Sequence, residues 1–317
     1  MLKAGVIGFG SIGKRHCENL ISLGYPDITL FRQKGQGNPL ELPEVSSFEK
    51  FINIPFDFVL IANPTSRHFE YLKELIPLQR NLFVEKPLVA SSQELSELSK
   101  LLTTYMATGI CAYNLRFHPC VNKVMELITD NKVGRIYSAR FSVGQFLPDW
   151  RPASDYRTSY SAKIEMGGGV VLDLIHEIDL AFHLCGKYQS DLHAMVSKIS
   201  DLEIETEDIA EIHYRSEKGA LVSIHLDYLT RGYSRNFNLV GEKGTIYCDL
   251  HKSVVEYVND EKLSESFTFE SFNRNDMYFS LMKYYTECVI YGATAEPSLL
   301  EGLDSLQTAL EVKSKFN

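Results

Sequence analysis

The fold is decided by Ala4-Gly5-Val6-Ile7-Gly8-Phe9-Gly10-Ser11-Ile12-Gly13, near the start of the chain. The apolar run predicts a buried strand, and the Gly-x-Gly-x-x-Gly pattern after it predicts a tight turn into a helix. In such turns the first glycine permits the bend, the second lets the backbone approach a pyrophosphate, and the third lets helix and strand pack closely. The helix N-terminus adds free N–H groups and the positive end of a dipole. Residues 8–13 therefore predict a dinucleotide site.

The residues that follow complete a β-α-β unit. Residues 14–21 predict a helix that Gly24 ends, and Ile28-Thr29-Leu30-Phe31 predicts the second strand. NAD enzymes usually carry Asp or Glu at the end of this strand for the ribose 2′-hydroxyl, whereas this chain has Arg32, then Gln33 and Lys34. A guanidinium suits a 2′-phosphate through charge-assisted bonds, so we expect NADP in preference to NAD. The alternative is an exposed arginine at a strand end, with NAD as the cofactor.

Composition limits the class of protein. The chain has 317 residues, enough for two domains, and a net charge of −9 that argues against nucleic acid as a partner. No apolar stretch reaches the roughly 18 residues needed to cross a bilayer, and because a strand pattern begins at the N-terminus we expect no signal peptide. The six cysteines are scattered and include no Cys-x-x-Cys pair, which predicts free thiols in a reducing cytoplasm. The cysteines and histidines are not clustered closely enough to predict a metal site.

Strand and helix patterns alternate through the first third of the chain. Apolar runs at 56–62, 81–84 and 106–113 predict strands, and Ser91 or Ser92 predicts the N-cap of a helix with leucines at helical spacing. We expect a Rossmann-type doubly wound parallel sheet of about six strands in a domain of residues 1–118. Ligands bind at the carboxyl ends of such strands, so the turns after the first, third and fourth strands should face one crevice.

The pattern changes in residues 119–317. Period-two alternation predicts strands at 136–143, 208–214, 220–228, 236–240 and 245–249, with a weaker candidate at 267–269. Helical patterns cover 170–185, 277–291 and 299–315. We therefore expect an α/β chain in which the Rossmann domain is followed by an α+β domain with a large, mostly antiparallel open sheet.

Two stretches carry residues suited to acid–base chemistry. Glu85-Lys86-Pro87 follows a parallel strand, and a partly desolvated lysine beside a cationic nicotinamide can titrate low enough to move a proton. The alternative is a solvated surface pair. Asp173, His176 and Asp179 recur every three residues after Gly167-Gly168-Gly169, so we expect one helix face on which a carboxylate orients the imidazole. The alternative is a capped helix with ion pairs and a core histidine.

The loop before this helix is rich in arginine, tyrosine and lysine. It contains Trp150-Arg151-Pro152, Asp155-Tyr156-Arg157 and Tyr160-Ser161-Ala162-Lys163. Such groups suit an anionic or heavily hydroxylated ligand, so we expect Trp150, Tyr156 and Arg157 to contact the substrate. The alternative is a structural loop anchored by Trp150.

In this order, the motifs resemble the glucose–fructose oxidoreductase/inositol dehydrogenase (Gfo/Idh/MocA) family over the whole chain. The resemblance rests on residues 8–13, Asn63-Pro64-Thr65-Ser66-Arg67-His68, Glu85-Lys86-Pro87, Tyr113-Asn114-Leu115-Arg116-Phe117-His118-Pro119, and the three glycines with the helix after them. The loop of residues 150–163 is similar to that of the subgroup associated with nucleotide-sugar and surface-glycan biosynthesis.

The resemblance implies NAD(P)-dependent hydride transfer between nicotinamide and a carbon of a sugar, sugar derivative or cyclitol. The substrate is then a small sugar or a nucleotide sugar, and the open sheet builds a homodimer or homotetramer. The catalytic residues that it implies are Lys86, His176 and Asp173. The cofactor-binding residues are Asn63, Pro64, Thr65, His68, Glu85 and Lys86. The substrate-binding residues are Asn114, Arg116, Asp173 and His176. Asp173 and Asp179 are both candidates for orienting His176.

Two other functions fit the same sequence. One is a non-catalytic NADP-sensing regulator, against which Lys86 and His176 argue because a sensor needs no acid–base pair. The other is a sugar reductase or lyase that holds its cofactor tightly, which retention of NADP(H) during purification would reveal.

Overall fold

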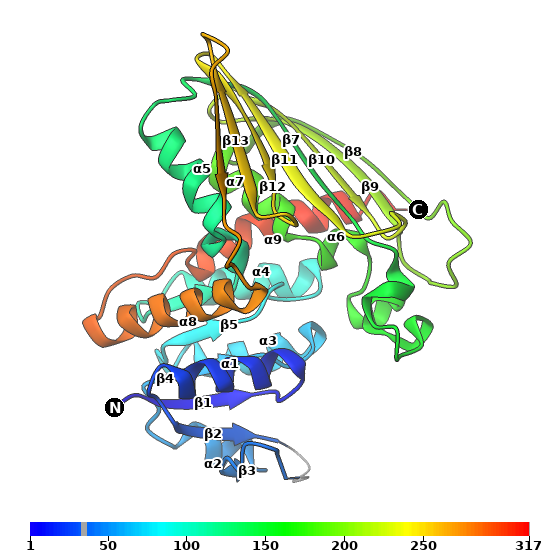
Figure 1. Ribbon diagram of the computed structural model, residues 1–317. Coiled ribbons are helices and arrows are strands. Elements are labelled where there is room, and N and C mark those ends of the chain that lie inside the picture. The colour runs from blue at the N-terminus through cyan, green and yellow to red at the C-terminus, as the bar shows by residue number, and fades with distance from the viewer. Residues whose placement is uncertain (33–36, 317) are drawn as a thin grey trace. The chain divides into compact units, whose positions relative to one another are not determined.

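The computed structural model describes residues 1–32 and 37–316, so Gln33 and Lys34 lie outside the described residues. The chain divides into two compact units (Figure 1). Unit 1 comprises Met1–Asn114 and Tyr278–Leu306, and unit 2 comprises Leu115–Met277 and Gln307–Asn317. That residues 1–118 and 119–317 are separate domains stays a prediction. None of the described helices has the length and hydropathy to cross a membrane.

Unit 1 is built on a six-stranded parallel sheet in the order β3-β2-β1-β4-β5-β6. Its elements are β1 (Lys3–Ile7), α1 (Ser11–Ser22), β2 (Asp27–Phe31), β3 (Glu44–Val45), α2 (Phe48–Ile52), β4 (Phe58–Ile61), η1 (Thr65–Arg67), α3 (His68–Leu75), β5 (Leu82–Val84), α4 (Ser92–Leu102), β6 (Gly109–Cys111), most of α8 (Arg274–Tyr291) and the start of α9 (Leu299–Lys313). The predicted doubly wound parallel sheet is confirmed.

Both faces of this sheet are buried under helices. On one face the rings of Phe58 and Phe83 each meet Tyr285 of α8 at 5.4 Å between centroids. On the other face Phe31 packs against Phe51 of α2 and Tyr71 of α3. Burial on two sides explains why these strands are continuous apolar runs, since neither face is left for polar residues.

Unit 2 is built on an eight-stranded sheet in the order β14-β13-β12-β11-β7-β10-β9-β8, in which only the β7–β10 pair is parallel. Its elements are η2 (Asn114–Phe117), α5 (Pro119–Thr129), β7 (Ile136–Gly144), η3 (Leu147–Trp150), η4 (Tyr156–Thr158), η5 (Tyr160–Ala162), η6 (Ile164–Met166), α6 (Val170–Asp173), α7 (His176–Cys185), β8 (Tyr188–Ser197), β9 (Ile209–Ser216), β10 (Leu221–Asp227), β11 (Ser234–Gly241), β12 (Gly244–Asp249), β13 (Val254–Asn259), β14 (Ser264–Thr268) and the end of α9.

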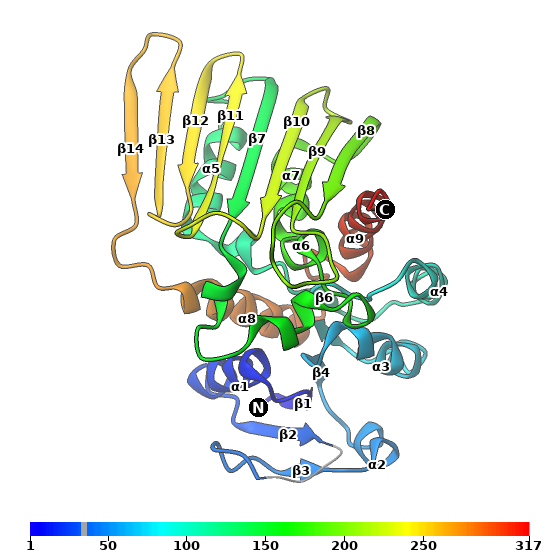
Figure 2. The same cartoon turned by 90° about the vertical axis from the view of Figure 1, so that its right-hand side faces the viewer.

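One face of this sheet carries the helices of unit 2. Figure 2 shows α5 and α7 behind the strands, and α7 packs on β7 and β10. Alternate residues such as Phe141 and Phe237, whose rings stack at 5.2 Å, point into this layer. The residues between them, such as Arg140, lie on the other face and are exposed. The predicted open, mostly antiparallel sheet is confirmed.

The predicted helix of residues 170–185 is two helices. Leu174 leaves the helical region, with φ −102° and ψ 25°, so α6 ends at Asp173 and α7 begins at His176. The expectation that Asp173, His176 and Asp179 share one face of a single helix is therefore wrong. The chain also forms β3, β8, β13 and α5, which were not predicted.

A buried ion pair fixes the start of α6. Glu207 is fully buried, and its carboxylate lies 3.3 Å from the ammonium of Lys313 at the end of α9. The same carboxylate accepts a 3.3 Å bond from the Val171 N–H, and Lys313 also donates to the Gly168 carbonyl. Gly169 has a φ of +114°, and a side chain there would collide with Glu207. Burial raises the pKa of Glu207, and the charge of Lys313 opposes that shift.

Lys313→Met should lower the free energy of unfolding by about 3 kcal/mol, because it leaves the buried Glu207 carboxylate without its counter-charge. The deficit should be largest at high pH and should shrink as the pH falls. The pKa of Glu207 is already raised in the folded protein, and loss of Lys313 raises it further, so the folded variant takes up a proton before the unfolded chain does. Urea denaturation at several pH values measures this.

The control is Glu207→Gln with Lys313→Met, which removes both charges and should recover part of the loss. A double variant as unstable as the single variant would contradict the ion-pair explanation.

Candidate functional site

The turn between β1 and α1 uses each of its three glycines differently. Gly8 has a φ of +96°, and a side chain there would collide with the backbone of Asn63. A side chain on Gly13 would collide with the Gly8 carbonyl, so this glycine lets helix and strand pack. A side chain on Gly10 would meet nothing within 4 Å in the described chain, so the backbone there faces open space. These are the three roles by which the motif admits a pyrophosphate.

Polar groups around this turn fit such a ligand. The first bond within α1 runs from the Lys14 N–H to the Gly10 carbonyl at 2.9 Å, which leaves the preceding N–H groups of the helix without a helical acceptor. The first turn has no acidic residue and no capping side chain. Beside Gly8, both side-chain amide atoms of Asn63 are buried and have no hydrogen-bond partner among the described residues. The residues present therefore fit a dinucleotide, which would supply partners for these groups.

His68 ties the turns after β4 and β5 together. Its ring nitrogens lie 2.8 Å from the Asn63 carbonyl oxygen and 3.0 Å from that of Pro87. The ring is 1% exposed, and burial lowers the pKa of His68, which favours the neutral imidazole. His68 thus supports this turn from beneath, while Pro64 and Thr65 form its more exposed part.

Glu85 and Lys86 lie at the carboxyl end of β5. The Glu85 carboxylate is 2.7 Å from Nε2 of His16, a fully buried residue of α1 whose ring packs on the edge of Phe83. This contact ties the turn after β5 to the helix that starts at the glycine turn. Lys86 follows, half-buried, and its peptide bond to Pro87 is cis. The predicted catalytic lysine therefore lies on the same sheet edge as the glycine turn.

Arg32 has a carboxylate partner that the sequence did not indicate. Its guanidinium donates to Glu44 at 3.0 Å and to the Gly37 carbonyl at 2.8 Å, and it lies over the Phe9 ring at 5.8 Å. Glu44 begins β3 and pairs in register with Leu30 of β2. An arginine and a carboxylate therefore share the end of β2, where the ribose of a dinucleotide binds.

In unit 2 the predicted acid–base residues lie at the junction of α6 and α7. Asp173 is 7% exposed and accepts a 2.6 Å hydrogen bond from the Tyr228 hydroxyl. Tyr160 is close enough to Asp173 for the carboxylate to act on the tyrosine's pKa. Burial and the nearby Asp173 raise the pKa of both phenols, so both stay protonated at neutral pH. His176 begins α7 and is partly exposed.

Asp179 is engaged by Arg116. The guanidinium donates bonds of 2.9 and 2.7 Å to the two carboxylate oxygens, so the predicted substrate arginine is held in a bidentate pair. Asp179 is therefore already paired within unit 2, whereas Asp173 is hydrogen-bonded to the neutral Tyr228 hydroxyl. Asn114 lies at the start of η2 and is buried.

The predicted substrate loop is held by its own hydrogen bonds and ion pairs. The Trp150 indole N–H donates to the Gln145 carbonyl at 3.0 Å. Arg157 is paired with Asp155 at 2.9 Å and with Glu203 at 3.3 Å, so its charge is largely neutralised. The Tyr156 hydroxyl accepts a 3.3 Å bond from the Glu203 N–H. Arg157 therefore contributes less charge to a ligand than the sequence suggested.

Three residues that lie next to the predicted site residues were not identified from the sequence. Glu44, Tyr160 and Tyr228 each reach Arg32 or Asp173 through tertiary packing, and no local motif marks them. Glu44 could be placed near Arg32 only once β3 was known to pair with β2. Tyr228 could be placed only once residues 228–230 were known to bond with residues 145–147.

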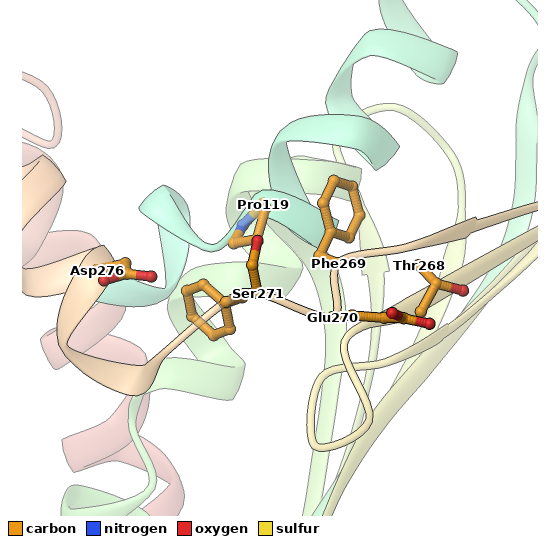
Figure 3. Close-up of a pocket in the computed structure, with 7 residues that line it drawn as sticks. Pro119, Thr268, Phe269, Glu270, Ser271 and Asp276 are labelled. Atoms are coloured by element: carbon orange, nitrogen blue, oxygen red, sulfur yellow. The ribbon is translucent and has the colours of Figure 1, made fainter.

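A separate groove of about 560 Å³ lies in unit 2 between α5 and the segment after β14 (Figure 3). Its lining residues are Pro119, Thr268, Phe269, Glu270, Ser271, Phe272 and Asp276. None of the predicted site residues lines it, and two of its lining residues are acidic. The groove is therefore unsuited to an anionic ligand. No group of three or more metal-ligating side chains occurs within the described part of the chain.

Comparison with known proteins places both halves of the chain. Residues 2–110 match the model of the oxidoreductase family with an NAD-binding Rossmann fold, and residues 121–247 match the GFO/IDH/MocA C-terminal domain. The chain is 26% identical to myo-inositol 2-dehydrogenase of Thermotoga maritima, over 98% of this chain and 93% of that one. It is 23% identical to glucose-6-phosphate 3-dehydrogenase of Bacillus subtilis, over 71% and 67%.

A solved structure has the same fold. Levoglucosan dehydrogenase in complex with NADH and levoglucosan superposes with a TM-score of 0.86, covering 99% of this chain and 97% of that one at 19% identity. The glycine turn in unit 1, the Asp173 site in unit 2 and the matches to both family models agree, and the chain belongs to the GFO/IDH/MocA family of NAD(P)-dependent oxidoreductases.

Proposed function

We propose that this protein transfers a hydride between a nicotinamide cofactor and a CH–OH or keto carbon of a sugar, sugar derivative or cyclitol. The observation that carries the proposal is Asp173, a buried carboxylate that the Tyr228 hydroxyl holds in place three residues before His176. A buried carboxylate that is held by a hydrogen bond close to a histidine is an arrangement suited to acid–base chemistry. The named sugar and cyclitol dehydrogenases to which the chain is similar support the same class of substrate.

The chain's own residues would handle the proton of the reacting hydroxyl. A bound nicotinamide supplies hydride acceptance and donation. His176 is the proposed general acid–base, because a partly exposed imidazole can exchange a proton with both substrate and water. Asp173 is proposed to orient that imidazole and to stabilise its charged form. Lys86 is proposed to contact the cofactor and the reacting hydroxyl.

We also propose NADP as the preferred cofactor, with NAD as the alternative. Arg32 supports NADP, since its guanidinium can bind a 2′-phosphate. Glu44 supports NAD, since its carboxylate can accept a hydrogen bond from a 2′-hydroxyl. The ion pair between Arg32 and Glu44 must open or adapt for a 2′-phosphate to bind Arg32.

We further propose a homodimer or homotetramer formed through the open face of the unit 2 sheet. This face is hollowed by about 500 Å³ and lined by exposed side chains such as Arg140, His193 and His213. A cytoplasmic location is proposed from the six cysteines, all of which are buried and none of which forms a disulfide within the described chain.

Lys86→Ala should lower kcat by about 100- to 10,000-fold, the loss typical of removing a group that assists proton transfer. Cofactor binding should remain, because the glycine turn that holds the pyrophosphate is untouched. Steady-state kinetics and NADPH fluorescence titration measure the two effects separately. Lys73→Ala, an exposed lysine of α3, is the matched control. Full turnover by the Lys86 variant would contradict the catalytic role proposed for Lys86.

Wild-type protein should bind NADPH more tightly than NADH, and the difference should shrink with added salt. Arg32→Ala should weaken NADPH binding about 10- to 100-fold and leave NADH binding nearly unchanged, since one charge-assisted contact to the 2′-phosphate is lost. Glu44→Gln should tighten NADPH binding by releasing Arg32. Fluorescence titrations at two salt concentrations measure all three. Tighter binding of NADH, weakened by Glu44→Gln, would show that Glu44 selects NAD.

A further inference from the structure

Two consecutive loop residues pack on Tyr228, which hydrogen-bonds Asp173, and on Tyr160. Trp150 meets Tyr228 edge-on, with ring centroids 5.3 Å apart. Arg151 lies over the ring of Tyr160 at 5.8 Å and is exposed. Tyr228 hydrogen-bonds Asp173, and Tyr160 is influenced electrostatically by both Asp173 and Arg151, so Trp150 and Arg151 lie next to the surroundings of Asp173 in unit 2.

A second arginine comes from the neighbouring loop between β10 and β11. The Phe146 N–H donates to the Thr230 carbonyl at 2.7 Å, and the Leu147 N–H donates to the Tyr228 carbonyl at 2.9 Å. These bonds hold the two loops side by side. Arg231 follows directly and stacks on the Phe146 ring at 3.4 Å. Arg151 and Arg231 thus belong to two loops that are hydrogen-bonded to each other, and each guanidinium packs over an aromatic ring.

Among the described residues, no carboxylate pairs with these two arginines, whereas several other cations of unit 2 are paired. Carboxylates pair with Arg116, Arg157, Lys163, Arg235 and Lys313. Within the described residues, neither Arg151 nor Arg231 forms an ion pair. Their charge is therefore available to a ligand, and stacking on an aromatic ring reduces the side-chain freedom that binding would have to remove.

We propose that Arg151 and Arg231 form an arginine subsite that binds an ionised substituent, a carboxylate or a phosphate, on the sugar substrate. This inference rests on the proposed function, whose catalytic carboxylate is Asp173. A guanidinium presents paired donors that match a carboxylate or phosphate. An anionic substrate would otherwise be repelled by the carboxylate of Asp173, and two cations on the adjoining loops would offset that repulsion.

Four compounds that share one glucopyranose ring provide the test. Glucose is neutral, glucuronate carries a carboxylate, glucose 6-phosphate carries a phosphate, and UDP-glucose carries a diphosphate at the anomeric carbon. For each compound, kcat/KM is measured, and binding to the cofactor-loaded protein is measured by calorimetry. The anionic compound that binds best identifies the source of the charge.

Arg151→Gln and Arg231→Gln should each lower the preference for the best anionic compound over glucose by about tenfold, the loss of one partly screened charge-assisted contact. The double variant should lose most of the preference. Binding and turnover of glucose, and the melting temperature, should be unchanged. Arg135→Gln is the matched control, because Arg135 also stacks on a tyrosine, Tyr137, but precedes β7 instead of following it.

The two proposals fail in different ways. Arginine-dependent binding of an anionic compound without turnover would support the subsite and contradict the proposed dehydrogenase activity. Turnover with equal preference for glucose in wild type and in both variants would support the activity and overturn the subsite. If no anionic compound binds better than glucose, the subsite is likewise overturned.

Discussion

A carboxylate taken out of water must be given hydrogen-bond donors or a counter-charge, and four of the buried carboxylates of unit 2 hold α6 and α7 in place. Asp173, Glu177, Asp179 and Glu207 are all buried. Their partners, in the same order, come from other elements: Tyr228, Arg235, Arg116 and Lys313. Leaving any of these groups unpaired would be costly, so the four contacts together fix where α6 and α7 lie. The geometry at Asp173 is a consequence of this requirement.

In unit 1 the equivalent constraint is the lack of space around the glycine turn. Two of its glycines lie where a side chain would collide with backbone, and the third faces open space. Behind the turn, His16 and His68 are buried and bind groups of the next two turns along the sheet. Crowding on one side and open space on the other give the turn a single orientation, with its N–H groups facing the side on which a phosphate can approach.

Much of the fold could be predicted because local chemistry determines it. Gly24 has a φ of +86° just after α1, and the Ser91 side chain caps α4, as their positions in the sequence indicated. β3 was missed because it is two residues long, and β8 because it is a polar edge strand with shifts in register. β13 was missed because its valines lie on both faces, which hides the period of two.

The site was predictable only in part, for the same reason. The glycine turn and the order of the motifs are local properties. The break at Leu174 is not, because no glycine or proline marks it and α6 is held at its start by Glu207, which is distant in sequence. The pairing of Arg116 with Asp179 likewise joins residues 63 positions apart. Residue identities thus gave the candidates, and only the tertiary structure showed which charges were already neutralised.

The position of Trp150 makes its intrinsic fluorescence a probe of the Asp173 site. The chain has one tryptophan, and that indole packs edge-on against the tyrosine whose hydroxyl holds Asp173. Its emission therefore arises from a single known place, free of background from other indoles. Any event that shifts the loop or the tyrosine changes the surroundings of this one chromophore, so motion at the acid–base residues can be followed in solution without attaching a label.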